Sequence, residues 1–503
     1  MTRSELCGSE SALFLLGVTK GPAQESRSSD SSLLSKPSKW KRSSCAEDAV
    51  IEDPPWYISL MVKFSFAVAF LAGIFADWLR KRGIIKVNIA SDDPRHKGFA
   101  PLDNHFEAIY INHIYRKSSD VVNRPICSVP GSVMRLKERY TDDNGWTQKF
   151  TGKERDVINM GSYNYLGFSH NDGLCVEEAA RFIDMYGLHI GSSRHERGNH
   201  VVHTMIEECV ARYLGVEAAI CFPMGFATNS MNIPSLVDKG SLILSDELNH
   251  ASLVLGCRVS GATIAVFKHN NAKDCEDKLR NALCYPSQKT GKPFNKVLIV
   301  IEGIYSMEGT IVNLPEFIRI KKKYNAYLFL DEAHSVGVVE YWGCNAGDVD
   351  IMMGTLTKSF AAAGGYMGGR KAVIDYIRCS SAAPCYGAAM SPPIVAQVLS
   401  SMKIMHGEDG TDTGARKALQ LLRNSRYFRR RLKQMGFLIY GHEDSPVVPL
   451  MTFYISKVVE FSRQTLKYDI GLVAVGFPAT PLTKARVRFC LSADHTKEQL
   501  DYV

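Results

Sequence analysis

The sequence contains no Cys-x-x-Cys pair, although it has 13 cysteines among its 503 residues. Pairs at that spacing are typical of zinc sites, and an even set at regular spacing is typical of small secreted proteins held together by disulfides. A scattered, odd-numbered set is typical of buried thiols in a reducing compartment. The cysteines therefore predict neither a zinc site nor a disulfide framework.

A dense block of basic residues is also missing. The formal net charge of +8 is modest, and the Lys and Arg residues fall in short clusters. Proteins that bind nucleic acids usually concentrate these residues on one face, so we do not expect a nucleic-acid partner. A phosphate-rich ligand or an anionic membrane surface would use the same surplus of positive charge.

The histidine-rich segment His195 to His203 does not have the spacing of a metal-binding helix. His195 and His200 are separated by one residue more than the two-histidine metalloprotease motif allows. Gly198, between them, also disfavours a helix. We therefore expect no metal site here.

One long apolar run stands out against an otherwise mixed sequence. Residues 1–55 are rich in Ser, Lys and Arg and predict a disordered tail. Residues 56–82 contain the run ISLMVKFSFAVAFLAGIFA, interrupted mainly by Lys63, and predict a membrane-associated helix. Its length suits one membrane crossing, and a helix that lies in the membrane surface is the alternative. The basic residues that follow the run favour a cytosolic C-terminal side.

The rest of the sequence predicts an α/β fold. Residues 83–157 form a polar connector and N-terminal arm, 158–405 a large domain, and 406–503 a smaller C-terminal domain. In the large domain, apolar segments such as Val297–Ile301 and Tyr327–Leu330 alternate with amphipathic ones such as Glu316–Tyr324. This pattern predicts a mostly parallel sheet covered on both faces, with ligands bound at the carboxyl ends of its strands.

The segment Gly354–Phe360 (GTLTKSF) follows an apolar segment, Ile351–Met353. Its lysine, Lys358, lies past an expected strand, among small residues where solvation is poor. Desolvation lowers the pKa of a lysine and frees its amine to attack a carbonyl. Thr355, three residues earlier, is placed to bond a phosphate oxygen. Because most lysines at strand ends are surface charges, this segment alone does not establish a site.

A second apolar segment is followed by Asp331-Glu332-Ala333-His334. A carboxylate next to a pyridine nitrogen keeps the nitrogen protonated and makes the ring an electron sink. Asp331 is a candidate for this carboxylate. His334 would lie near a ring hydroxyl. Ser306, in the loop IEGIYSMEG after another strand, offers a neutral hydrogen bond. An Asp that caps the next helix and an ordinary loop are the structural alternatives.

Two further segments complete the set. MGFATN opens a helix, where the backbone amides of Gly225 and Phe226 are free to bind a phosphate. SDELNHAS contains His250, which can lie flat on a cofactor ring. Most helix starts bind nothing, and a single histidine is more often structural, so neither segment is decisive alone.

Together, the order and spacing of these segments resemble the alpha-oxoamine synthases, a family of fold-type-I pyridoxal-phosphate enzymes. The resemblance covers about residues 158–496 and is carried by MGSYNYLGF, MGFATNSMNIP, SDELNHASLVLG, EGIYSMEGTIV and VGFPATP. It implies a large cofactor-binding domain with a mostly parallel sheet and a smaller C-terminal α+β domain.

The resemblance also implies roles for individual residues. Lys358 would bind pyridoxal phosphate covalently and later take the α-proton of the amino acid substrate. Arg488, in ARVRF, would bind the substrate carboxylate, with a structural surface arginine as the alternative. His250, Asp331 and His334 would also be catalytic. Besides Lys358, the residues that would contact the cofactor are Asp331, His334, His250, Ser306, Thr355, Gly225 and Phe226.

Within the family, these segments are most similar to the catalytic subunits that condense L-serine with a long-chain acyl-CoA to a keto-sphinganine, the first step of sphingolipid synthesis. The resemblance implies an endoplasmic reticulum membrane protein with a cytosolic catalytic domain and a partner subunit that lacks the lysine. Two alternatives stay open: a non-catalytic, membrane-bound structural subunit of the same complex, and a related enzyme that uses glycine and a shorter acyl-CoA.

The chain departs from the family pattern in three places. A glycine-rich stretch that the family has after Gly337 is missing, so we expect the local backbone to differ from that of the family. Ala361 stands where the family usually has glycine, and would destabilise the fold if the backbone there has a positive φ. The sequence stops at Val503, where relatives carry a further helix, so we expect a truncated small domain.

Overall fold

The computed structural model describes residues 53–84, 98–99, 105–143, 145–338 and 344–503. By compactness the chain divides into residues 1–47 and residues 48–503, and every described residue belongs to the second part. The predicted disordered tail therefore lies almost wholly outside the described residues. The segment after Gly337, residues 339–343, lies outside them as well.

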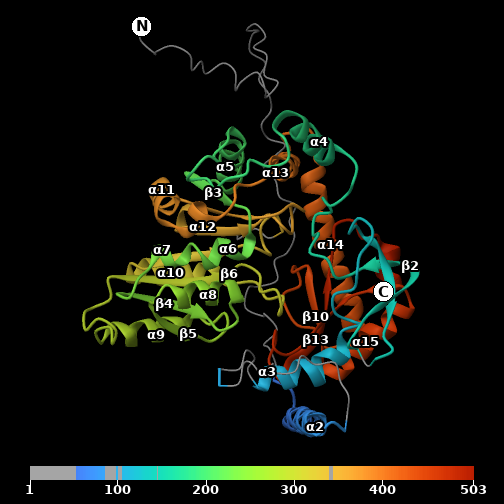
Figure 1. The fold of residues 1–503 in the computed structure, drawn as a ribbon. Helices are drawn as coiled ribbons and strands as arrows, with labels where there is room; N and C mark the ends of the chain where they lie inside the picture. The colour runs from blue at the N-terminus through green and yellow to red at the C-terminus, as the bar shows by residue number, and fades with distance from the viewer. Residues whose placement is uncertain (1–52, 85–97, 100–104, 144, 339–343) are drawn as a thin grey trace, which may run out of the picture. The chain divides into compact units, whose positions relative to one another are not determined.

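A seven-stranded sheet forms the centre of the large domain (Figure 1). Its strand order is β3-β9-β8-β7-β6-β4-β5, and all neighbours are parallel except that β9 runs antiparallel to β3 and β8. The mostly parallel sheet predicted from the sequence is thus confirmed. The strands are β3 (Ala218–Phe222), β4 (Ser241–Asp246), β5 (Thr263–Phe267), β6 (Lys296–Glu302), β7 (Tyr327–Asp331), β8 (Ile351–Thr355) and β9 (Gly365–Gly369).

Helices cover both faces of this sheet, which explains why its strands are apolar throughout. Along β6, Leu298 and Val300 join one apolar cluster, whereas Ile299 and Ile301 join another on the opposite face. Successive side chains of a strand point to opposite faces, so both faces are buried. The first cluster includes residues of α7 (Ile233–Leu236), α8 (Ala251–Val259) and α11 (Lys371–Ser380), and the second includes residues of α9 (Ala272–Leu283) and α10 (Leu314–Tyr324).

Local sequence signals define where α10 begins and ends. Pro315 and Glu316 lie in its first turn, where a missing N–H costs nothing and a negative charge is favourable. Three lysines occupy the last turn, and Asn325 follows in the left-handed conformation with φ of 50°. These signals place the helix between β6 and β7, as the sequence predicts.

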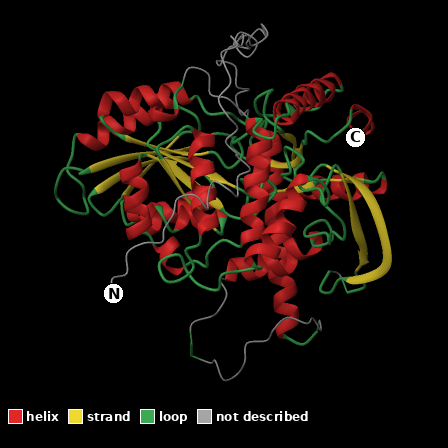
Figure 2. Cartoon of the chain, turned by 90° about the horizontal axis from the view of Figure 1, so that it is seen from above, coloured by secondary structure: helices red, strands yellow, loops and turns green. Residues whose placement is uncertain are grey.

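Two three-stranded sheets lie outside the central sheet, and all strands are drawn in yellow in Figure 2. Their orders are β10-β13-β12 and β1-β2-β11, so the N-terminal arm pairs with the C-terminal part. Residues far apart in the sequence, such as Met160 and Leu500, share one apolar core. The elements are β1 (Val133–Tyr140), β2 (Lys149–Asn159), β10 (Val447–Phe453), β11 (Ile470–Gly471), β12 (Val473–Val475), β13 (Ala485–Cys490), α14 (Thr413–Gln434), α15 (Ile455–Lys467) and α16 (Lys497–Tyr502).

The remaining described helices connect these parts. They are α3 (His105–Ile109), the π-helix η2 (Tyr110–Ile114), the 3-10 helices η3 (Tyr115–Ser118), η4 (Ala346–Asp348) and η5 (Leu482–Lys484), α4 (Leu174–Tyr186), α5 (Val201–Leu214), α6 (Gly225–Ser230), α12 (Ala382–Tyr386) and α13 (Pro392–His406). His200 precedes α5, and its imidazole accepts a hydrogen bond from the N–H of Val202. That histidine therefore serves as a helix cap.

The apolar run forms α2 (Trp56–Lys81), long and apolar enough to cross a membrane. The mean hydropathy of its most apolar window is 2.1, and only 11% of that window is buried. One face packs on the protein, where the ring of Phe66 lies 6.3 Å from the rings of Tyr110 and Phe477. The other face leaves apolar side chains exposed, including Leu60, Phe64 and Leu71. This exposed face supports the predicted association with a membrane.

Candidate active site

Polar residues lie at the carboxyl ends of four neighbouring strands of the seven-stranded sheet. Asp246 ends β4, Glu302 ends β6, Asp331 ends β7 and Thr355 ends β8. These strands are parallel, and the pairing places Glu302 directly opposite Asp331. The carboxyl ends of parallel strands are where open α/β sheets bind ligands. The candidate site therefore lies at the carboxyl ends of these strands, as the sequence predicts.

Lys358 follows β8 by three residues and is largely buried there. Its ammonium lies 5.6 Å from the centre of the Tyr163 ring. Within the described part of the chain, it makes no side-chain hydrogen bond or ion pair. Burial lowers its pKa from 10.5 to about 8, although Asp331 and Glu302 act in the opposite direction. An appreciable fraction of Lys358 is thus a free amine near neutral pH, as a nucleophile requires.

Asp331 is buried, and two donors hold its carboxylate. The side-chain amide of Asn229 donates to Oδ2 at 2.7 Å, and the backbone N–H of Ala333 donates to Oδ1 at 2.9 Å. The Asn229 amide also donates to the hydroxyl of Ser252 at 3.0 Å. These two donors fix the orientation of the Asp331 carboxylate. Asp331 is therefore suited to bond the protonated nitrogen of a ring.

His250 caps α8, and several neighbours set the position of its ring. Its Nδ1 lies 2.8 Å from the hydroxyl of Ser252 and accepts a hydrogen bond from that residue's N–H. The Phe226 ring lies edge-on, with ring centroids 6.0 Å apart. Burial lowers the pKa of His250, a shift that Asp331 opposes and Lys358 reinforces. A neutral imidazole in this position can stack on a flat ligand.

His334 is buried beside Tyr163 and Tyr165. Its Nδ1 is 2.8 Å from the hydroxyl of Tyr165, and its ring is 5.1 Å from that of Tyr163. Burial lowers its pKa well below 6.5, and the charges of Lys358 and Arg488 lower it further. His334 is therefore a neutral hydrogen-bonding group.

The structure brings Gly225 and Thr355 together. A Cβ on Gly225 would lie 3.1 Å from the Thr355 methyl and 3.3 Å from the carbonyl oxygen of Gly364. The absence of a side chain at Gly225 thus leaves the backbone open beside the Thr355 side chain, whose hydroxyl donates to the carbonyl of Ala333 at 3.3 Å. Backbone amides and a hydroxyl at such an opening are suited to a phosphate. Phe226 follows Gly225 and is partly exposed.

Arg488 reaches the site from β13, in the small domain. Its guanidinium lies 4.8 Å from the Tyr163 ring, which Lys358 also contacts. Nη1 lies 3.5 Å from the carbonyl oxygen of Ser306 and 3.5 Å from the Met307 sulfur. Nε is buried and has no partner among the described residues. An incompletely bonded guanidinium next to Lys358 fits a substrate carboxylate.

Three residues of the site were not singled out from the sequence. Asn229 and Tyr163 lie in segments that carry the family resemblance, but their contacts with Asp331 and Lys358 depend on the fold. Glu302 is buried opposite Asp331 and accepts a hydrogen bond from the backbone N–H of His250. Burial and the Asp331 charge raise its pKa well above 4.5. An acidic residue at the end of a strand next to the Asp331 strand was a signal available in the sequence.

These observations fit pyridoxal phosphate. Its aldehyde is matched by an amine that has no partner among the described residues, and its ring nitrogen by a buried carboxylate held by two donors. Its ring face is matched by a neutral histidine, and its phosphate by the open backbone at Gly225. Within the described ranges, no cluster of three or more His, Cys, Asp or Glu residues could hold a metal ion.

Comparison with known proteins agrees with this assignment. Residues 155–503 match the family Aminotransferase class I and II. Serine palmitoyltransferase 3 of Caenorhabditis elegans is 66% identical over 90% of this chain and 90% of its own. Serine palmitoyltransferase 3 of Homo sapiens is 49% identical over 90% of this chain and 84% of its own.

Solved structures agree as well. The serine palmitoyltransferase of Sphingomonas wittichii superimposes with a TM-score of 0.68 at 25% identity, over 80% of this chain and 96% of its own. A structure of SPT with the PLP internal aldimine gives a TM-score of 0.63 at 27% identity, over 70% of this chain and 86% of its own. The fold, the cofactor and the family expected from the sequence are thereby confirmed. The chain belongs to the aminotransferase class I and II family, as a pyridoxal-phosphate-dependent acyltransferase related to the serine palmitoyltransferases.

Proposed function

We propose that this chain is the catalytic subunit of a serine palmitoyltransferase. It condenses L-serine with a long-chain acyl-CoA: the serine α-carbon forms a bond to the acyl carbon, the thioester C–S bond breaks, and carbon dioxide leaves. The products are a keto-sphinganine and free coenzyme A. The observation that carries this proposal is Lys358, a largely buried amine at the carboxyl ends of the strands that has no bonding partner among the described residues. A purely structural subunit has no need of such an amine.

The residues around Lys358 support this chemistry. When bound, pyridoxal phosphate supplies a protonated pyridine ring that withdraws electrons from the α-carbon of an attached amino acid. Asp331, held by Asn229, would keep the ring proton in place. His250 is oriented by Ser252 to cover one face of the ring. Both interactions strengthen as negative charge develops, so they favour the transition state over the ground state.

Proton transfer and orientation of the substrate fall to two basic residues that both lie against the Tyr163 ring. Lys358, with a pKa of about 8, can accept the α-proton of serine near neutral pH. Arg488, whose buried Nε has no partner among the described residues, binds the serine carboxylate. Ser306 and His334 hold the edge of the cofactor, and Gly225, Phe226 and Thr355 form the wall at its phosphate.

We also propose that the protein resides in the endoplasmic reticulum membrane, with the catalytic domain in the cytosol and a partner subunit that lacks the lysine. The exposed apolar face of α2 and the names of the relatives support this assignment. The tail at residues 1–55, the arm at 83–157, the large domain at 158–405 and the small domain at 406–503 remain the proposed boundaries.

A product assay tests the proposal. The chain is co-expressed with its partner subunit and supplied with serine or glycine, each with palmitoyl-CoA or acetyl-CoA. We expect a long-chain keto base from serine and palmitoyl-CoA, and none when Lys358 is replaced by Ala. Product from glycine and acetyl-CoA instead would identify a different acyl transfer. Equal activity of the Lys358→Ala complex would assign the chain a structural role.

A further inference from the structure

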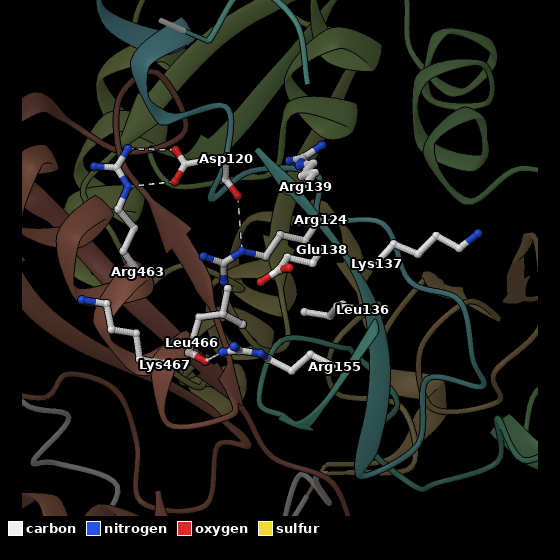
Figure 3. A pocket seen from close by; sticks show the side chains of 10 residues that line it. All are labelled: Asp120, Arg124, Leu136, Lys137, Glu138, Arg139, Arg155, Arg463, Leu466 and Lys467. Carbon is white, nitrogen blue, oxygen red and sulfur yellow. Dashed lines mark hydrogen bonds and ion pairs between the residues drawn. The ribbon is translucent and has the colours of Figure 1, made fainter. Parts of the chain in front are cut away.

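A cavity of about 250 Å³ lies between the β1–β2 hairpin, α15 and the segment that precedes β1 (Figure 3). None of the predicted site residues lines it. Six basic side chains and two carboxylates do: Arg124, Lys137, Arg139, Arg155, Arg463 and Lys467, with Asp120 and Glu138. Its size suits a small polar group rather than a whole cofactor.

Two of the guanidiniums in this cavity have buried nitrogens without partners. Nη1 of Arg124 and Nε of Arg139 are inaccessible and bond to none of the described residues. Their other nitrogens are fixed by backbone carbonyls: Arg124 donates to Ser462 at 3.1 Å, and Arg139 donates to Ser119 and Val122 at 2.7 and 2.6 Å. Because these bonds set the directions of both side chains, the unused donors are held in place. A buried donor without an acceptor is unfavourable unless a ligand supplies one.

The carboxylates neutralise only part of this positive charge. Asp120 forms two bonds of 2.8 Å with Arg463, which occupies that carboxylate (Figure 3). Glu138 accepts from the Thr151 hydroxyl at 2.9 Å and forms no ion pair among the described residues. Burial lowers the pKa of Arg124; the charge of Asp120 opposes this shift, and the charges of Arg139 and Arg463 reinforce it. Several like charges therefore lie close together around the cavity, where an anion would stabilise them.

The cavity is connected to the part of the chain that packs on α2. Tyr110, in η2, contacts Phe66 of α2. From η2 the chain runs through η3 directly to Asp120 and Arg124, and the carbonyl of Lys117 accepts a hydrogen bond from Arg463 at 2.9 Å. A helix held at a membrane would therefore bring this basic cavity near the lipid headgroups. Basic pockets at that level recognise anionic headgroups.

We propose that this cavity binds a phosphate group carried by a membrane lipid, with Arg124 and Arg139 as its principal donors. Arginine is suited to this role because hydrogen bonds from a charged guanidinium to phosphate oxygens are stronger than those between neutral groups. The site is separate from the one that holds the cofactor, so lipid binding and cofactor binding can be measured independently.

The test uses the detergent-solubilised complex of the chain with its partner subunit. The unfolding temperature is titrated with dioctanoyl phosphatidic acid, dioctanoyl glycerol and inorganic phosphate. We expect stabilisation by phosphatidic acid at the lowest concentrations, a weaker effect of inorganic phosphate, and none with the diacylglycerol. Arg124→Gln combined with Arg139→Gln should raise the dissociation constant for phosphatidic acid about tenfold or more, the effect of losing one charge-assisted hydrogen bond.

Arg135→Gln is the matched control. Arg135 lies on β1 close to Arg139, but it is exposed and pairs with Asp156 outside the cavity, so its loss should leave the dissociation constant unchanged. Lys137→Gln with Lys467→Gln provides a second test, because both side chains are exposed and bear no described ion pair, and their loss should weaken binding without disturbing the fold.

Other results would overturn the proposal. If Arg135→Gln weakened the binding of phosphatidic acid equally, the effect would be one of net charge alone. If diacylglycerol raised the unfolding temperature as much as phosphatidic acid, the phosphate would not be the recognised group. Inorganic phosphate that binds as tightly as phosphatidic acid would keep the anion site but reject its assignment to lipid.

Discussion

Lys358 is subject to opposing influences on its pKa. Burial lowers the pKa, whereas the carboxylates of Asp331 and Glu302 raise it, and the result is about 8. The two carboxylates do not act equally, because Asp331 has the larger effect on the pKa of Lys358. Burial and the charge of Asp331 raise the pKa of Glu302 well above 4.5.

This difference predicts how attachment of the cofactor depends on pH. The rate at which apo-protein takes up pyridoxal phosphate should rise as pH increases through about 8, because only the neutral amine of Lys358 attacks an aldehyde. Asp331→Asn should move the midpoint to lower pH, because it removes the negative charge that favours the ammonium form. Visible absorbance after rapid mixing measures the rate.

Glu302→Gln is the control for this prediction. It removes the carboxylate with the smaller effect on the pKa of Lys358, so the midpoint should move to lower pH by less than in Asp331→Asn. A larger downward shift for Glu302→Gln than for Asp331→Asn would contradict this ranking of the two carboxylates.

Among residues, the sequence predicted those that follow apolar strands and missed those defined by contacts across the fold. Asp331, Thr355 and Lys358 occur just where strands end, so a local pattern reveals them. Asn229 and Tyr163 join the site only because the fold places α6 next to Asp331 and the segment that contains Tyr163 next to Lys358. No local pattern specifies those contacts.

At the scale of elements, the apolar strands were predictable and the glycine-rich one was not. β9 has the sequence GYMGG, which lacks the β-branched residues typical of a strand. It forms because it completes the sheet between β3 and β8, where only glycine fits: a Cβ on Gly369 would lie 2.5 Å from the carbonyl oxygen of Asp350. The charged β1–β2 hairpin was likewise expected to be part of a connector, because its charges hide the strand pattern.

The turn after Lys358 carries a local strain that the sequence had suggested. Ala361, which stands where the family usually has glycine, has a φ of 50°. We expect Ala361→Gly to raise the free energy of unfolding by about 1 kcal/mol, because a Cβ is disfavoured in the left-handed region. Chemical denaturation of the purified complex measures the change.

Ala362→Gly serves as the comparison for this turn. Ala362 is not among the described residues with positive φ, so glycine there should lower stability through the greater entropy of the unfolded chain. If both substitutions lowered stability by the same amount, the strain at Ala361 would be disproved.

The exposed face of α2 predicts how firmly the protein is held at a membrane. Replacing Leu60, Phe64 and Leu71 together by Ser removes three exposed apolar side chains, each worth about 1.5–3 kcal/mol when buried in lipid. We expect more protein in the supernatant after alkaline carbonate extraction of membranes, with an unchanged unfolding temperature.

Tyr285→Ser is the control for this experiment, because Tyr285 is 74% exposed but lies beyond the end of α9, in the large domain. It should leave extraction unchanged. Retention of the triple variant at the level of the parent protein would show that this face of α2 does not contact lipid.

At the scale of the molecule, the site depends on two parts of the fold meeting at Tyr163. Lys358 comes from the large sheet and Arg488 from β13, and both lie against that ring. A buried ion pair connects the same two parts, since Nη1 of Arg486 lies 3.1 Å from Oε1 of Glu308 and donates to the carbonyl of Met307 at 2.7 Å. Such a buried pair fixes the register of β13 against the loop that carries Ser306.

The central claim is that Lys358 carries the cofactor, and one spectrum tests it most directly. The complex is purified with pyridoxal phosphate, and its absorbance is recorded before and after L-serine is added, for the parent protein and for Lys358→Ala. We predict a band at the visible edge that changes with serine and is absent from the folded variant. A folded parent complex without this band, or a variant that keeps it, would contradict the account and favour a non-catalytic subunit.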